Sequence, residues 1–123
     1  MGVPCLGVQI RCITCQDKDV FFEAYRGVYS SKEEAESFYC RFLDNGWISG
    51  AWKDHELIGV LAWAPRETVK NGLAEIIDIW VDVEERGKGI GGKLIDHAIG
   101  QMKRYYQRFK SKLRRVMLFT GGH

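Results

Sequence analysis

The strongest constraint on the fold is an abrupt change of character within residues 79–95. The stretch begins with an apolar run at 79–81, continues through a short acidic turn, and enters a basic segment with four glycines at residues 87–92. A helical pattern of apolar residues follows, so this order predicts a strand, a glycine loop and a helix. Glycines let a ligand approach the backbone closely, and the first amides of a helix carry partial positive charge. The junction therefore favours a ligand that bears phosphate.

The rest of the chain predicts a fold of strands and helices in mixed order. Alternating or continuous apolar runs predict strands over residues 6–13, 47–53, 56–64, 73–81 and 115–120. Helical spacing predicts helices over residues 20–28, 32–43 and 89–112. Their expected buried stripes are Val20, Phe21, Ala24 and Val28; Ala35, Phe38, Tyr39 and Phe42; and Ile90, Leu94, Ile95, Ala98, Met102, Tyr105 and Phe109.

This order, β-α-α-β-β-β-α-β, predicts one α/β domain over residues 1–123, of the α+β type with a mixed sheet. Asp54 and His55 form a tight turn between two strands, which predicts an antiparallel hairpin. The final strand, helix and strand require a right-handed crossover and hence a parallel pair. We expect a central mixed sheet with helices on both faces.

The charge is distributed unevenly along the sequence. Residues 1–85 hold 8 Lys or Arg and 15 Asp or Glu, whereas residues 86–123 hold 10 Lys or Arg and a single acid, Asp96. The change falls at Arg86, where the glycine loop begins, and it fits a small polyanionic ligand. For residues 103–115 a solvated basic helix face is the alternative. The sequence has no apolar run long enough to cross a bilayer and no signal peptide at its start, so we expect a cytoplasmic protein without a membrane partner.

The four cysteines do not predict a metal site. Cys12 and Cys15 form a C-x-x-C pair, but no second pair and no pair of histidines follows at zinc-binding spacing. An even number of cysteines in a chain without a signal peptide does not argue for disulfides. We therefore expect free thiols at Cys5, Cys12, Cys15 and Cys40, and no metal.

Two common phosphate-binding motifs match the glycine loop only in part. A Walker A loop would place a hydroxyl residue after Lys93 to hold Mg²⁺, and Leu94 stands there instead. A dinucleotide-binding fingerprint matches residues 87–92 literally. That fingerprint belongs near the first strand, however, and the acidic residue expected about 20 positions later is missing.

The sequence resembles the GNAT superfamily of acetyl-CoA-dependent N-acetyltransferases over about residues 8–120. Its signature, Gln/Arg-x-x-Gly-x-Gly/Ala, is present as Arg86-Gly87-Lys88-Gly89-Ile90-Gly91, and both the preceding strand and the order of elements agree. The resemblance implies acetyl-CoA as co-substrate and a β-bulge that splays the strand before the loop from the next strand. It also implies that main-chain groups of the strand pair with the pantetheine arm, and that the loop amides and Arg86 hold the pyrophosphate. The implied cofactor-binding residues are Ile79, Trp80, Val81, Arg86, Gly87, Lys88, Gly89, Ile90 and Gly91; for Lys88 a solvated loop lysine is the alternative.

The resemblance also implies a catalytic base at Glu75. Some members, including histone-acetylating ones, carry a glutamate at this distance before the signature, in an Ala-Glu-Ile context that residues 74–76 repeat. A base is needed because an amine with a pKa near 10 is mostly protonated at neutral pH. An exposed strand end or a pair with lysine is the alternative for Glu75. Strand alternation places Asp78 on the opposite face unless a bulge intervenes; it binds a cationic acceptor or forms a structural pair. The amide of Trp80 or Val81 is the candidate for polarising the thioester carbonyl.

The expected acceptor is an amine, either a small molecule or a peptide, because the N-terminal part is acidic. Five aromatic residues either line an acceptor pocket or, as we favour, pack in the core: Tyr25, Tyr29, Trp47, Trp52 and Trp63. Family members that use a tyrosine as general acid carry it on a helix after the fifth strand. We expect a short form that lacks this helix and the family's final hairpin, and we expect Tyr105 and Tyr106 to pack and His123 to fray.

Two other functions are compatible with parts of the sequence. One is a degenerate module that senses acetyl-CoA without catalysis. The other is a nucleic-acid-binding domain that uses residues 103–115; it lacks a recognised motif, and the acidic first part would repel DNA, so we expect no nucleic-acid partner. The last predicted strand leaves an apolar edge at its Val116, Leu118 and Phe119, which predicts a homodimer that covers this edge.

Overall fold

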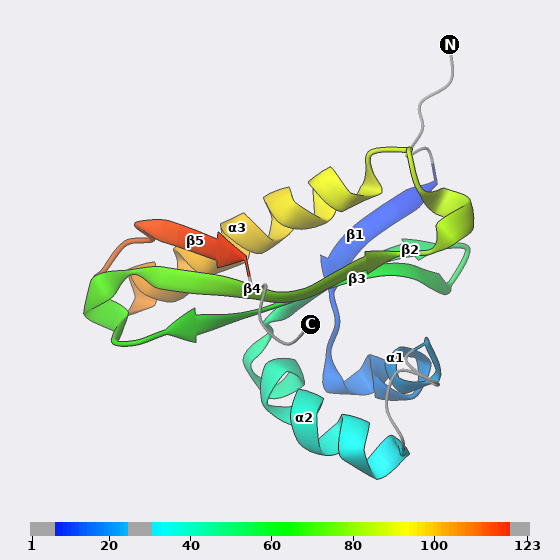
Figure 1. Ribbon diagram of the computed structural model, residues 1–123, viewed down its shortest axis with the longest axis horizontal. Helices are drawn as coiled ribbons and strands as arrows, with labels where there is room; N and C mark the ends of the chain where they lie inside the picture. The colour runs from blue at the N-terminus through cyan, green and yellow to red at the C-terminus, as the bar shows by residue number, and fades with distance from the viewer. Residues whose placement is uncertain (1–6, 25–30, 119–123) are drawn as a thin grey trace.

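The computed structural model describes residues 7–24 and 31–118, and its elements follow the predicted order. The sheet has five strands in the spatial order β1-β2-β3-β4-β5, antiparallel throughout except for the parallel pair of β4 and β5 (Figure 1). The strands are β1 (Val8–Cys12), β2 (Ile48–Lys53), β3 (Glu56–Arg66), β4 (Leu73–Val81) and β5 (Arg115–Leu118). The helices are α1 (Lys18–Ala24), α2 (Lys32–Asn45) and α3 (Ile90–Arg108), with short 3-10 turns η1 (Cys15–Asp17), η2 (Val69–Asn71) and η3 (Val83–Glu85).

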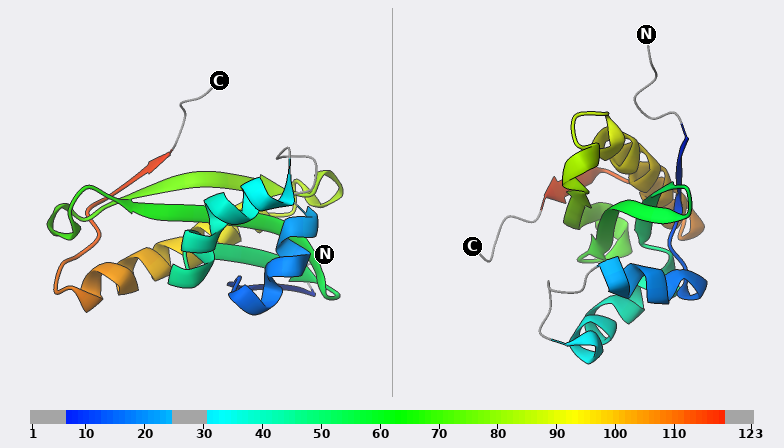
Figure 2. Two further views of the ribbon diagram at one scale, coloured as in Figure 1. Left: turned by 90° about the horizontal axis from the view of Figure 1, so that it is seen from below. Right: turned by 90° about the vertical axis from the view of Figure 1, so that its right-hand side faces the viewer.

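The sheet lies between two helical layers, as the mixed-sheet prediction requires. Helix α3 covers one face, and α1 and α2 cover the other (Figure 2). Strand β3 carries the continuous apolar run that such double coverage demands, and its residues from Leu57 to Ala64 are buried. No helix in residues 7–24 and 31–118 is long and apolar enough to cross a bilayer.

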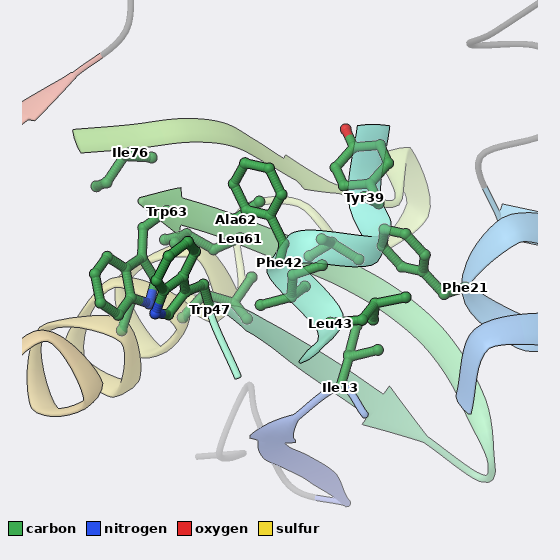
Figure 3. Close-up of a cluster of buried hydrophobic side chains, with 14 of the residues drawn as sticks. Ile13, Phe21, Tyr39, Phe42, Leu43, Trp47, Leu61, Ala62, Trp63 and Ile76 are labelled. Carbon is green, nitrogen blue, oxygen red and sulfur yellow. The ribbon is translucent and has the colours of Figure 1, made fainter. Parts of the chain in front are cut away.

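Helix α2 packs an aromatic face against the sheet. It begins at Ser31, whose hydroxyl accepts from the amide of Glu34 at 3.0 Å, a standard N-cap. Figure 3 shows Tyr39, Phe42 and Leu43 of this helix in the core cluster. The prediction that Phe38 is buried was wrong, because 44% of its surface is exposed and Leu43 packs inward instead.

The face of α1 also differs from the prediction. Phe21 and Phe22 are buried, whereas Val20, expected in the stripe, is 43% exposed. Val28 of the predicted stripe lies outside the described residues.

Helix α3 ends earlier than predicted and buries a slightly different stripe. The predicted helix continued to residue 112, but Phe109 leaves helical geometry and Lys110 adopts a left-handed conformation with φ 58°. The buried residues recur at a spacing of four: Ile90, Leu94, Ala98, Met102 and Tyr106. Tyr106 is therefore buried where Phe109 was expected, while Tyr105 packs at the margin of the core; the hydroxyl of Tyr106 donates to the carbonyl of Leu73 at the start of β4.

One irregularity in β4 opens the sheet. Ala62 pairs with Asp78 and Trp63 with Ile76, so Ile77 is an extra residue on β4, a β-bulge. The parallel pairing with β5 extends only from Leu73 to Ile76. Within the described residues, the second half of β4 therefore has no strand on the side of β5 (Figure 1).

Candidate functional site

The open edge of β4 presents main-chain groups from alternate residues. The amide of Asp82 donates to the carbonyl of Ile58 at 2.7 Å, which fixes the alternation of this antiparallel pair. The main-chain groups of Trp80 consequently point toward β3, and those of Ile79 and Val81 point toward the open side. Of the three residues predicted to pair with an extended ligand, these two have the required orientation.

The glycine loop that follows β4 leaves helical amides without an intrahelical partner. Gly87 and Gly89 both have a φ of 81°, which favours glycine, and Gly89 is the N-cap of α3 without a side-chain cap. The amide of Lys93 makes the first turn's bond, to the carbonyl of Gly89 at 3.2 Å, so the amides of residues 90–92 have no acceptor within the helix. A Cβ added at Gly87, Gly91 or Gly92 would meet nothing within 4 Å among the described residues. A ligand can therefore reach this backbone directly.

Three basic side chains near the loop, those of Lys53, Arg86 and Lys88, already have partners. Lys88 and Lys53 both contact the carboxylate of Glu85, at 3.0 Å and 3.3 Å. The hydrogen bond from Lys88, followed by that from Lys53, holds the pKa of Glu85 below its usual range. Arg86 is exposed and its Nε donates to the carbonyl of Val81 at 2.9 Å. Arg86 and Lys88 therefore supply positive charge within the loop that leads to these amides.

The bulge also brings two carboxylates to one face of β4. Glu75 pairs with Ala64 and Asp78 with Ala62, and these two alanines lie on the same face of β3. Simple alternation, which predicts opposite faces for the two acids, fails because Ile77 inserts one residue between them. The shared face is the one that α1 and α2 cover, since the hydroxyl of Tyr39 in α2 donates to Asp78 Oδ2 at 3.3 Å.

Glu75 is nearly buried, with 9% of its surface exposed, and it pairs with an arginine. Arg66 Nε lies 3.1 Å from Glu75 Oε1, and more than half of the Arg66 side chain is exposed to solvent. The structure therefore rules out an exposed strand end for Glu75 and replaces the anticipated lysine partner with Arg66.

Sequence reasoning did not identify Tyr39 and Arg66 as partners of the two acids. Tyr39 was placed in the core stripe of α2, and this is confirmed because it is 1% exposed. Figure 3 shows its ring packed in the aromatic cluster with the oxygen at the edge of that cluster. No spacing in the sequence indicates either contact, since both depend on the register of β3 with β4 and on the packing of α2.

Other candidate residues lie away from this face or outside the described residues. Trp47, Trp52 and Trp63 are buried in the core, as favoured from the sequence. Tyr25, Tyr29 and His123 lie outside the described residues.

The cysteines make separate contacts. Cys12, Cys15 and Cys40 are free thiols, while Cys5 lies outside the described residues. Cys12 Sγ accepts from Gln101 and Cys15 donates to Asp44. Within residues 7–24 and 31–118 no three His, Cys, Asp or Glu side chains converge as a metal ion would require.

Solved structures with the same architecture are N-acetyltransferases. Ribosomal-protein-alanine N-acetyltransferase from Brucella melitensis biovar Abortus 2308 aligns over 92% of this chain and 79% of its own, with 18% identity and a TM-score of 0.64. The apo aminoglycoside 6'-N-acetyltransferase AAC(6')-Ig from Acinetobacter haemolyticus aligns over the same fractions, with 17% identity and a TM-score of 0.68. The PaiA N-acetyltransferase from Thermoplasma acidophilum, solved with coenzyme A, covers 80% of this chain and 73% of its own, with 25% identity and a TM-score of 0.60.

The sequence itself carries the same signal. No curated protein sequence matches the chain significantly. The model of the acetyltransferase (GNAT) family, however, matches residues 18–120, which include every helix and strand except β1. The fold, the open edge of β4 and the glycine loop all agree with this family match. The chain therefore belongs to the GNAT acetyltransferase family and is an acyltransferase.

Proposed function

We propose that the protein transfers the acetyl group of acetyl-CoA to a cationic amine by direct attack within a ternary complex. One observation carries the proposal: a single strand, β4, has an unpaired edge, leads into a loop of free amides, and carries two carboxylates on one face. The donor would lie along the edge and the acceptor would meet the face. The structure of the PaiA N-acetyltransferase with coenzyme A supports the choice of donor.

The donor would extend the sheet beside β4. The amides and carbonyls of the pantetheine arm would pair with the main-chain groups of Ile79 and Val81, as a further strand does. The pyrophosphate would lie on the free amides of residues 90–92, where the helix dipole favours negative charge. Arg86 and Lys88 would then exchange their present partners, the Val81 carbonyl and Glu85, for phosphate oxygens.

The chemistry needs a neutral amine and a stabilised tetrahedral oxyanion. Glu75 would accept the proton of the ammonium, directly or through a water molecule, because it is the carboxylate held in the interior of this face. A backbone amide on the open edge would hold the oxyanion. Of the two amides considered from the sequence, that of Trp80 faces β3, and that of Val81 lies beside the loop, where it would pair with the pantetheine arm. The amide of Ile79, which also faces the open side and is nearer Glu75, would hold the oxyanion. The thiolate of CoA would take its proton from solvent.

Asp78 is the reason to propose a cationic amine as the acceptor. It lies on the same face as Glu75, and a buried tyrosine fixes its orientation. The two carboxylates pair with alanines that lie two residues apart on β3, so they are neighbours on this face. Together they would attract an amine while it is still protonated. Asp78 would hold a positive charge of the acceptor, while Glu75 would deprotonate the reacting nitrogen.

A CoA-release assay with a panel of amines tests these roles. Glu75→Gln should lower kcat/KM by about 10²- to 10⁴-fold, the range for loss of a general base, and leave the Kd of acetyl-CoA unchanged. Asp78→Asn should mainly raise KM for acceptors with more than one positive charge. Glu56→Gln, which alters an exposed acid at the other end of β3, is the matched control and should be neutral.

Two outcomes would contradict the proposal. Tight binding of acetyl-CoA without CoA release for any amine would indicate a sensing module. An unchanged rate for Glu75→Gln would place the base elsewhere.

A further inference from the structure

Five exposed cations gather at the end of the molecule where β4 begins and α3 ends. This basic platform consists of Lys70, Lys110, Lys112, Arg114 and Arg115. They line two adjoining hollows of about 590 Å³ and 620 Å³, which share Lys70 and Arg114. An extended anion could therefore pass from one hollow to the other without leaving the cations.

The basic platform is held by backbone contacts. Gly72 has a φ of 65°, and a Cβ there would lie 2.2 Å from the carbonyl oxygen of Lys112, so only glycine allows this approach. The amide of Arg114 donates to the carbonyl of Gly72 at 2.8 Å, and the hydroxyl of Ser111 donates to the carbonyl of Val69 at 2.9 Å. The segment that follows α3 is thus fixed on η2, and the cations are arranged before any ligand arrives.

The positive charges of the basic platform are not neutralised by the protein. Within the described residues none of the five cations forms an ion pair; the cations that do are Arg11, Lys18, Lys53, Arg66 and Lys88. Glu67, the nearest acid along the chain to Lys70, accepts from Asn71. The end of α3 favours a cation at Lys110, but Lys70, Arg114 and Arg115 belong to other elements. Uncompensated cations on three segments favour a polyanionic ligand.

This ligand would be distinct from the proposed donor. The glycine loop follows the other end of β4, and the nine residues of this strand span roughly 26 Å at about 3.3 Å per residue. Figure 1 shows η3 and the hairpin of β2 and β3 at one end of the long axis. The last turn of α3 and the start of β5 lie at the other end. A hollow near that hairpin is lined by Asp19, Glu23, Asp54 and Glu56, which would repel a polyanion. This acidic hollow would not extend the binding of a polyanion, so the basic platform and the glycine loop are separate regions for anions.

An exposed aromatic ring in the first hollow of the basic platform indicates which class of polyanion would bind there. Phe109 is 53% exposed and lines the hollow beside Lys110 and Lys112. Cations that track phosphates and an exposed ring that stacks on a base are the combination that binds single-stranded nucleic acid. We propose that the basic platform binds a short single-stranded nucleic acid, with phosphates on the cations and a base on Phe109. The expectation of no such partner rested on the lack of a recognised motif and on repulsion by the acidic part of the sequence; the acidic hollow lies at the opposite end.

Fluorescence anisotropy with a labelled oligo(dT) of about 12 nucleotides tests the proposal on the full chain. The affinity should fall with salt, with a slope of log K against log salt of about −3 for four or five neutralised phosphates. Lys70→Glu/Arg114→Glu should weaken binding by about tenfold or more. Phe109→Ala should weaken it about tenfold without changing the salt slope.

The matched control reverses two cations that lie outside the hollows. Lys18→Glu/Lys103→Glu makes the same change in net charge and should alter the affinity by less than about twofold. An unchanged melting temperature and acetyl-CoA affinity would show that each variant is folded. The proposal is overturned if the control weakens binding as much as the platform pair, or if the wild type does not bind at low salt. It is also overturned if poly-glutamate binds and the oligonucleotide does not, which would indicate an acidic protein partner.

Discussion

Ser49, fully buried in β2, connects the sheet to α3 through two polar side chains. Its hydroxyl donates to Gln101 Oε1 at 3.0 Å and lies 2.8 Å from His97 Nδ1. Because the single hydroxyl proton goes to Gln101, His97 Nδ1 carries a proton and donates to Ser49. Gln101 also accepts from Trp63 Nε1 and donates to Cys12 Sγ. This polar cluster lies on the face opposite Glu75 and Asp78, and it holds α3 in position.

His97 should make stability fall in mild acid. Burial, and then the charge of Arg104, lowers the pKa of His97 below its ordinary value of 6.5. Below about pH 6.5 the unfolded chain therefore binds a proton that the folded protein resists. Stability is complete above about pH 6.5 and declines as pH falls toward the lowered pKa. The melting temperature measured from about pH 8 to 5.5 should show this decline.

Two variants isolate the contribution of His97. His97→Gln keeps a donor for Ser49 and should flatten the decline, whereas His55→Asn, in the exposed hairpin turn, should retain it. The lowered pKa values of Asp17 and Glu85 act only below the ordinary carboxyl range, outside this window. Parallel curves for the wild type and His97→Gln would disprove the assignment.

At the scale of single residues, the sequence determines only part of the candidate site. The resemblance to the family indicated Glu75, through its distance from the glycine signature. The shared face of Glu75 and Asp78 did not follow, because one extra residue at Ile77 reverses the alternation and no residue type marks a bulge there. The partners Tyr39 and Arg66 come from elements whose register and packing only the folded chain sets.

At the scale of elements, the order of strands and helices followed from periodicity, and so did the glycine loop. Apolar spacing is a local property, so it located α3 and β4 well. It failed at the end of α3, because the apolar Phe109 continues the helical pattern while the docking of the next segment on Gly72 requires the chain to turn. Tertiary contacts, rather than propensity, end this helix.

The first turn of α3 offers a direct test of the phosphate site. Gly92 lies inside the helix, one residue beyond the position where the signature admits alanine, and a Cβ there meets nothing within 4 Å among the described residues, so Gly92→Ala fits without strain. Alanine favours the helix by about 0.5–1 kcal/mol over glycine, so the melting temperature should be unchanged or higher. A methyl group between the free amides and a pyrophosphate should nevertheless raise the Kd of acetyl-CoA about tenfold or more, measured by calorimetry.

Gly100 supplies the control on the same helix. Its added Cβ makes only an ordinary contact, 3.5 Å from the Arg104 side chain, and it lies far from the loop. Gly100→Ala should raise stability similarly and leave the Kd unchanged. Equal affinity of both variants and the wild type would show that phosphate does not approach the start of α3.

At the scale of the whole molecule, one charge asymmetry in the sequence becomes two separate basic regions. Basic residues after position 85 cluster beyond each end of α3, and its 19 residues separate the two clusters by roughly 27 Å at 1.5 Å per residue. Arg86 and Lys88 surround the glycine loop, whereas Lys110 and Arg114 belong to the basic platform. The sequence revealed the excess of charge but not this division, because only the direction of α3 along the sheet creates it.

The free side of β5 predicts that the protein assembles as a homodimer. This strand pairs with β4 on one side, and within the described residues no strand lies on its other side. Leu118 at its end is 63% exposed, and an unpaired apolar edge favours pairing with a second copy about a two-fold axis.

Light scattering after gel filtration should give about twice the 14.1 kDa of the chain. Leu118→Lys should shift the protein toward monomer. Val20→Lys, which alters an exposed apolar residue on α1, should not. A wild-type mass of one chain at every concentration tested would refute the dimer.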